Sequence, residues 1–99
     1  MIYTYIFTPR ALVQLKDAYE WYAKQSEITG EHFRTAVREQ VEQICLNPTL
    51  YRNTRKNFRE KSLLKFPFSI VFVIDKKAHI VAVTSVFHHR RNPKGKYPA

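Results

Sequence analysis

Glycine, cysteine and long apolar runs are scarce in this sequence. Two glycines and five prolines among 99 residues exclude a collagen-like chain and a flexible low-complexity chain. The single cysteine, Cys45, allows no internal disulfide, and we expect it to be a small buried hydrophobe in a reducing compartment. The longest apolar run, Ile70 to Ile74, is too short to span a membrane, and the N-terminus lacks the features of a signal peptide. We therefore expect a cytoplasmic protein.

Acidic residues are also few, and the charge is unevenly distributed. Eight Asp and Glu stand against 17 Lys and Arg, so the net charge is +9 and the pI about 9.9. Residues 1–47 carry five basic and six acidic residues, a net charge of −1. Residues 48–99 carry twelve basic and two acidic residues, a net charge of +10. Such a basic half indicates an anionic partner: nucleic acid, an acidic membrane surface or an acidic protein. Solubility alone is the alternative explanation.

The length suits a single domain over residues 1–99, with 44% hydrophobic and 14% aromatic residues to form one core. Residues 2–7 predict a strand, because each is β-branched or aromatic. Thr8 and Pro9 predict the start of a helix that runs to about Lys24. Its expected apolar face is Leu12, Leu15, Ala18, Tyr19 and Tyr22. After a break at residues 26–30, a second helix starts at Thr29 or Gly30, and Asn47 in a left-handed conformation and Pro48 end it. Its expected apolar stripe is Phe33, Val37, Val41 and Ile44.

The second half predicts a loop and then strands. Residues 49–59 read as an irregular basic loop, and residues 62–66 as a short strand. Residues 68–74 and 79–87 predict two strong strands with apolar residues on both faces, as expected for central strands. Residues 90–99 read as an exposed basic tail. The predicted fold is α+β, in the order β-α-α-β-β-β, with a helical hairpin packed on a curled, mainly antiparallel sheet.

Two basic clusters predict a surface that binds a nucleic acid or another target. The clusters are Arg52, Arg55, Lys56, Arg59, Lys61 and Lys65, and at the C-terminus Arg90, Arg91, Lys94 and Lys96. Cations interleaved with aromatic side chains suit phosphates and stacked bases. A solvated loop is the alternative interpretation of the first cluster.

Two adjacent histidines, His88 and His89, end the last predicted strand and should point to opposite faces of the sheet. One of them could act as general acid or base on an RNA 2′-hydroxyl beside an arginine. The interpretation we favour is a histidine that ends the strand by hydrogen-bonding its neighbours. The spacing of His, Cys and carboxylate residues predicts no metal site, and the motifs predict no cofactor.

Several motifs in sequence order resemble the RelE/ParE superfamily of type II toxin–antitoxin toxins. The similar segments are Thr8-Pro9-Arg10-Ala11, Trp21-Tyr22, Asn47-Pro48, residues 66–74, residues 80–87 and His88-His89-Arg90-Arg91-Asn92-Pro93. The last three resemble the ending of ParE-like members. The resemblance covers nearly the whole chain and implies a growth-inhibiting toxin, such as those that stabilise plasmids. It also implies a cognate antitoxin, for which we expect an acidic or amphipathic segment that binds at Tyr19, Trp21 and Tyr22.

The superfamily contains two mechanisms. RelE-like toxins cut mRNA on the ribosome, whereas ParE-like toxins inhibit DNA gyrase and are not nucleases. Ser69 stands where the ribonuclease branch has an arginine for the scissile phosphate, so we favour the ParE-like, non-enzymatic interpretation. If the chain is instead a ribonuclease, the candidate catalytic residues are His88, Arg91, Lys61, Lys65 and Tyr97. A non-toxic basic module that binds nucleic acid is a third possibility. Neither a membrane nor a metal is expected as a partner.

Overall fold

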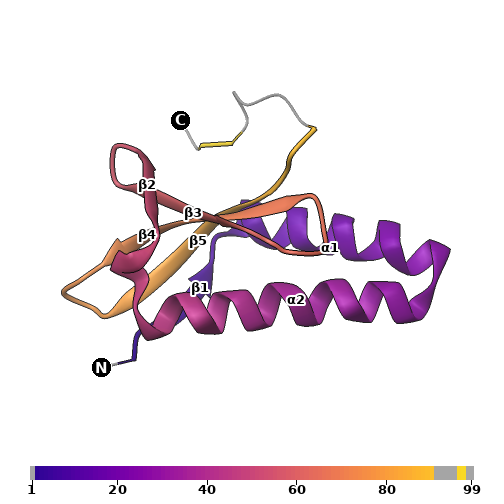
Figure 1. Cartoon of the computed structure of the whole chain (residues 1–99), viewed down its shortest axis with the longest axis horizontal. Helices are drawn as coiled ribbons and strands as arrows, with labels where there is room; N and C mark the ends of the chain where they lie inside the picture. The colour runs from indigo at the N-terminus through magenta and orange to yellow at the C-terminus, as the bar shows by residue number, and fades with distance from the viewer. Residues whose placement is uncertain (1, 91–95, 98–99) are drawn as a thin grey trace.

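The computed structural model describes residues 2–90 and 96–97 of the chain (Figure 1). Its elements are β1 (Thr4–Phe7), α1 (Pro9–Gln25), α2 (Glu27–Leu46), the 3₁₀ helix η1 (Pro48–Leu50), β2 (Arg52–Arg55), β3 (Phe58–Ser62), β4 (Phe68–Asp75) and β5 (Ile80–His88). In this described part, the strands form a sheet in the order β1-β5-β4-β3-β2. β1 is parallel to β5, and the other neighbouring strands are antiparallel. The predicted α+β class is confirmed.

The two helices form an antiparallel hairpin that covers one face of the sheet (Figure 1). The predicted stripe of α2 is buried throughout: Phe33, Val37, Val41 and Ile44. The predicted face of α1 is partly wrong, because Leu12 is 52% exposed and Ala11 is fully buried in its place. The small side chain of Ala11 allows the first turn of α1 to pack closely against the sheet. Neither helix is long and apolar enough to cross a membrane within the described residues.

A single residue, Ser26, separates the helices, so the predicted break at residues 26–30 is wrong. The backbone N–H of Ser26 donates to the Tyr22 carbonyl at 3.0 Å, and its Oγ accepts from Thr29 N at 3.4 Å. One residue therefore ends α1 and caps α2. Asn47 ends α2 as predicted, but with an extended φ of −159° rather than in the left-handed conformation.

β4 and β5 occupy central positions and are buried on both faces, as predicted. Their register shifts between Val71 and Phe72, which pair with Ser85 and Val83, so that Thr84 is the extra residue of a bulge. β1 pairs with β5 only as far as Val83. Beyond that point α1 takes over, because Oε1 of Gln14 accepts hydrogen bonds from Val86 N at 2.8 Å and Ser85 Oγ at 3.1 Å.

The predicted loop at residues 49–59 is wrong, because this segment forms η1, β2 and the first part of β3. Lys56 has a positive φ of 50° in the turn between the two strands. The predicted strand at residues 62–66 is also displaced, since β3 ends at Ser62. The β2–β3 hairpin has no alternating apolar pattern in its sequence. Pairing with β4 holds β3 in place, and β2 is an edge strand with mostly exposed side chains, so neither strand needs a row of buried apolar residues.

Candidate functional site

The sheet has one face that the helices leave uncovered, which we call the open face. Ile70 and Phe72 belong to the core beneath the helices, so the alternate residues of β4 point to the opposite side. The pairing of the strands assigns to the open face Phe58, Glu60, Ser62, Ser69, Val71 and Phe87. Residues 96–97 lie over this face (Figure 1).

Lys96 and Tyr97 pack on the open face around one carboxylate. Lys96 Nζ lies 2.7 Å from Glu60 Oε1, with the two side chains only 23% and 14% exposed. The Tyr97 hydroxyl lies 2.7 Å from Thr54 Oγ1 and 3.3 Å from Glu60 Oε1. The Tyr97 ring packs on Phe58, with 5.0 Å between ring centroids. These two residues of the predicted exposed tail are therefore largely buried, unlike the prediction for them.

A short chain of hydrogen bonds crosses the open face beside this contact. Ser62 Oγ lies 3.1 Å from Ser69 Oγ, which lies 2.9 Å from Nε2 of His89. Ser69 is buried, and its hydroxyl is already occupied on both sides. His88 points the other way and packs edge to face on Phe68 at 4.8 Å, as the alternation of the strand predicts.

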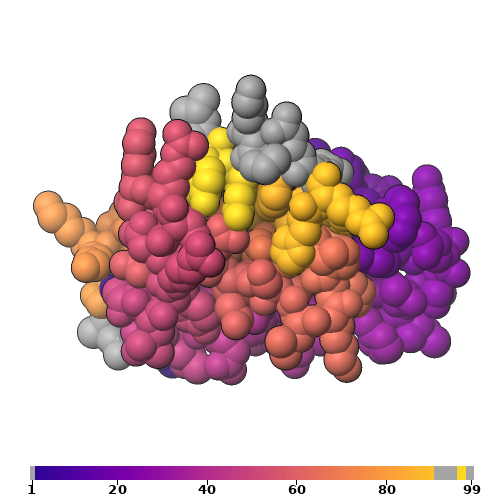
Figure 2. Space-filling view, turned by 45° about the horizontal axis from the view of Figure 1, so that its top comes forward, coloured from indigo at the N-terminus to yellow at the C-terminus, as the bar shows by residue number. Residues whose placement is uncertain are grey.

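Most of the predicted target-binding cations are exposed around the β2–β3 hairpin. In Figure 2 this hairpin projects beside residues 96–97. The exposed members are Arg52, Arg55, Lys56, Lys61 and Lys65, with Arg90 after β5. Arg59 differs, because its guanidinium donates to the Tyr51 carbonyl at 2.7 Å and to the Thr49 carbonyl at 3.4 Å. It thus ties η1 to β3. Arg91 and Lys94 lie outside the described residues.

The residues named for a ribonuclease site lie on both faces of the sheet. Lys61 pairs with Ile70 and His88 with Phe68, which puts both on the side of the helices. Tyr97 lies on the open face, where it contacts Thr54 and Glu60. Lys65 is exposed after the end of β3, and Arg91 is outside the described part. The structure therefore does not bring Lys61, His88 and Tyr97 together.

The three aromatic residues named for antitoxin binding have different surroundings. The Tyr19 hydroxyl donates to Glu31 Oε2 at 2.9 Å, and this hydrogen bond and the carboxylate charge raise the pKa of Tyr19. Tyr22 packs against Phe33 and Phe66 at 5.1 Å, and burial raises the pKa of Tyr22. Trp21 is 60% exposed. Of the three, Trp21 offers the apolar surface available to a partner.

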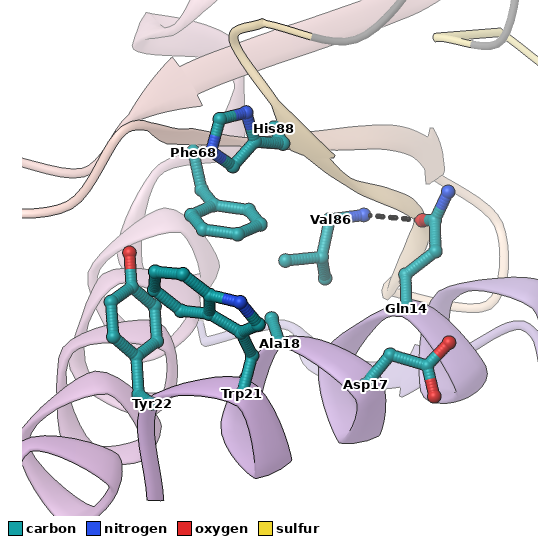
Figure 3. A pocket seen from close by; sticks show the side chains of 8 residues that line it. All are labelled: Gln14, Asp17, Ala18, Trp21, Tyr22, Phe68, Val86 and His88. Carbon is teal, nitrogen blue, oxygen red and sulfur yellow. Dashed lines mark hydrogen bonds between the residues drawn. The ribbon is translucent and has the colours of Figure 1, made fainter. Parts of the chain in front are cut away.

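Trp21 forms one wall of a pocket of about 470 Å³ between α1 and the sheet (Figure 3). The lining residues are Gln14, Asp17, Ala18, Trp21 and Tyr22 from α1, Phe68 from β4, and Val86 and His88 from β5. Gln14 and Asp17 are not among the residues predicted from the sequence to form a site. Their spacing from Trp21, at seven and four residues, is the signal that places them on one helix face.

No other described group suggests a catalytic or metal centre. Among residues 2–90 and 96–97, no cluster of three His, Cys, Asp or Glu side chains could hold a metal ion. Cys45 is buried, as predicted, and burial together with the Glu42 charge raises the pKa of its thiol. A thiol of raised pKa is a poor nucleophile at neutral pH.

Comparisons with known proteins agree with this fold. Three solved toxin–antitoxin systems are similar in structure. The ParDE system of P. aeruginosa matches with a TM-score of 0.73 and 16% identity, over 88% of this chain and 96% of that chain. RelBE2 of Mycobacterium tuberculosis has a TM-score of 0.62 and 15% identity, over 89% and 99% of the two chains. The E. coli RelBE complex has a TM-score of 0.59 and 16% identity, over 90% and 99%.

A family model also matches the sequence of the chain. No curated protein sequence matches the chain significantly. The family model described as the ParE toxin of the type II toxin–antitoxin system parDE matches residues 5–93. The resemblance found in the motifs is thereby confirmed, and the chain belongs to the ParE toxin family of type II toxin–antitoxin systems.

Proposed function

We propose that this chain inhibits DNA gyrase by binding it, without nuclease activity, and that a cognate antitoxin neutralises it. Family membership supports the role as a toxin. The solved structures of similar fold are toxin–antitoxin systems, which supports an antitoxin partner. The observation that carries the choice of mechanism is Ser69 on β4.

Ser69 is neutral, buried and engaged with His89 at 2.9 Å. Cleavage of RNA develops negative charge on the phosphate, and a cation fixed in the site stabilises that charge. A serine at this position cannot make the charge-assisted contact that an arginine would make. Lys61 and His88 lie on the other side of the sheet from Ser69. This arrangement favours a surface that binds over a site that cuts.

A supercoiling assay tests the mechanism directly. The purified protein should block supercoiling of relaxed plasmid by gyrase and leave ribosome-bound mRNA intact. His88→Ala should change inhibition only through the fold or the surface, because His88 packs edge to face on Phe68 on the helix side of the sheet. Cutting of mRNA on the ribosome, abolished by His88→Ala or Arg91→Ala in folded protein, would establish the RelE-like mechanism instead.

Charge reversal on the β2–β3 hairpin tests the proposed contact surface. Arg52→Glu with Lys56→Glu should weaken gyrase inhibition, because both side chains are exposed beside the open face. The matched control is Lys76→Glu with Lys77→Glu, which makes the same change in net charge at the exposed turn after β4. Equal effects of the two pairs would assign the loss to net charge rather than to the hairpin.

Growth assays test the toxin–antitoxin pairing. Expression of this chain alone should arrest growth, and co-expression with the neighbouring gene should restore growth. The resulting complex should survive high salt, because apolar contacts at Trp21 are not screened. A chain that leaves growth unaffected and binds nucleic acid with a steep salt dependence is instead the non-toxic module.

A further inference from the structure

The pocket beside Trp21 is walled by rings that hold one another in place (Figure 3). The Trp21 and Tyr22 rings meet edge to face, with 5.0 Å between centroids and 84° between planes. Phe68 meets His88 in the same way at 4.8 Å and 83°. These contacts orient the pocket walls before any ligand binds, which lowers the entropy that binding would cost.

Trp21 nevertheless keeps 60% of its surface exposed, although Tyr22, its neighbour in sequence, packs into the core. Tryptophan combines a large apolar area with few rotatable bonds and is enriched among residues that dominate binding energy. The exposed indole beside this cavity therefore offers a ring that suits a partner side chain.

A carboxylate stands one helical turn from this indole. Asp17 precedes Trp21 by four residues on α1, so their side chains share a helix face, and both line the pocket. Asp17 is exposed, and it is the one acidic or Lys/Arg residue in the pocket lining. Oε1 of Gln14, which also lines the pocket, already accepts hydrogen bonds from Val86 N and Ser85 Oγ. Asp17 is the one carboxylate of the lining that can accept from an incoming group.

We propose that this pocket receives an arginine side chain of a protein partner. A guanidinium can stack on the Trp21 face while its N–H groups bind the Asp17 carboxylate, and its aliphatic stem can cover Phe68 and Val86. Arginine suits the site better than lysine, because the planar guanidinium is more weakly hydrated and stacks on aromatic rings.

The antitoxin is the partner expected to supply this arginine, and to that extent the inference rests on the proposed function. Binding of an arginine derivative to the purified protein does not depend on gyrase or on the antitoxin. The two proposals can therefore fail independently. Arginine binding tests the pocket, and gyrase inhibition tests the proposed function.

The chain has one tryptophan, so the indole N–H signal in a nitrogen-15 NMR spectrum reports Trp21 alone. N-acetylarginine amide, titrated at constant ionic strength, should shift this signal saturably with a dissociation constant on the order of 1 mM. Asp17→Asn should weaken binding about fivefold, because it removes the charge-assisted contact. The matched control is Asp75→Asn at the β4–β5 turn, which removes the same charge and should bind like the unaltered protein.

Two further probes decide between a guanidinium site and a simple apolar cleft. N-acetyllysine amide and N-acetylnorleucine amide should each bind more weakly than the arginine derivative. Three outcomes would each overturn the proposal. They are equal affinity for the norleucine derivative and the arginine derivative, an Asp17→Asn variant that binds the arginine derivative as well as the unaltered protein does, and a shift of the indole signal that does not saturate. The circular dichroism spectrum of each variant establishes that it is folded.

Discussion

Ser69 Oγ lies 2.9 Å from Nε2 of His89, and this contact joins the start of β4 to the residue just beyond β5. Ser62 Oγ, on β3, lies 3.1 Å from Ser69 Oγ and extends this series of hydrogen bonds to a third strand. Three neighbouring strands are thus linked through side chains at one end of the open face. The contact with His89 also occupies the hydroxyl of Ser69. Ser69 is the residue on which the choice between a gyrase-binding toxin and a ribonuclease depends.

Ser69→Ala should lower the free energy of unfolding by about 1 kcal/mol, because it removes a buried hydroxyl that is hydrogen-bonded on both sides. Gyrase inhibition should persist, since the hydroxyl is buried and hydrogen-bonded within the sheet. Urea unfolding and the supercoiling assay measure the two effects. Ser62→Ala should lower the free energy of unfolding less, because Ser62 is exposed. Loss of inhibition in a stable Ser69→Ala protein would show that Ser69 takes part in function.

Glu60→Gln should destabilise the contact between the C-terminal segment and the sheet by about 1–2 kcal/mol, because it removes the charge that faces Lys96 at 2.7 Å. Glutamine keeps the shape and an acceptor for Tyr97, so the loss reports the charge. A double-mutant cycle with Lys96→Met should show coupling between the two sites. Additive effects of the two substitutions would contradict a specific ion pair.

Gly30→Ala should destabilise the helical hairpin although alanine is the better helix former by about 1 kcal/mol. A Cβ at Gly30 would lie 2.9 Å from Ala23 Cβ on the facing helix, which is closer than two carbon atoms can pack. Thermal unfolding should show a lower Tm. Combining Gly30→Ala with Ala23→Gly should recover only part of the loss, because the backbone Cα and N of residue 23 would still lie 3.0 and 3.2 Å from the new Cβ. A Tm that rises in Gly30→Ala would contradict the close approach.

Gln14→Leu should lower the free energy of unfolding by about 1–3 kcal/mol, because it leaves the Val86 N–H beyond the end of β1 without its acceptor. Gln14→Glu keeps an acceptor oxygen and should cost less. Hydrogen exchange at the Val86 amide gives a local readout, and this exchange should accelerate in Gln14→Leu. Unchanged protection at Val86 would show that another group accepts this hydrogen bond.

Cys45 should make the protein less stable at alkaline pH. Its thiol has a raised pKa in the folded state, chiefly through burial, so the folded protein holds the proton more tightly than the unfolded chain. The resulting stability is full below the unfolded pKa of about 8.5 and is lost as the pH rises through the higher folded value. Unfolding between neutral pH and about pH 10 should therefore show a steeper loss than in Cys45→Ala. Identical pH slopes would contradict a buried, protonated thiol.

Local pattern was sufficient to predict the helices and the central strands. The α2 stripe from Phe33 to Ile44 repeats with helical period, and the alternation in β4 and β5 has apolar residues on both faces. Thr8 and Pro9 mark the start of α1. Each of these signals depends on neighbours within a few residues, so it is visible in the sequence. The family resemblance followed from the order of such local motifs.

The tertiary structure alone decided the β2–β3 hairpin and the composition of the candidate sites. The residues of β2 and β3 have no alternating apolar pattern, because β3 is held by pairing with β4, and β2 by pairing with β3, rather than by burial of alternate side chains. Glu60 and Lys96 are far apart in the sequence and meet only because the chain returns over the open face. Asp17 and Trp21 share a helix face by spacing, but they line a pocket only because β4 and β5 bring Phe68 and His88 opposite them. Contacts between distant segments depend on packing of the whole chain, which local spacing does not encode.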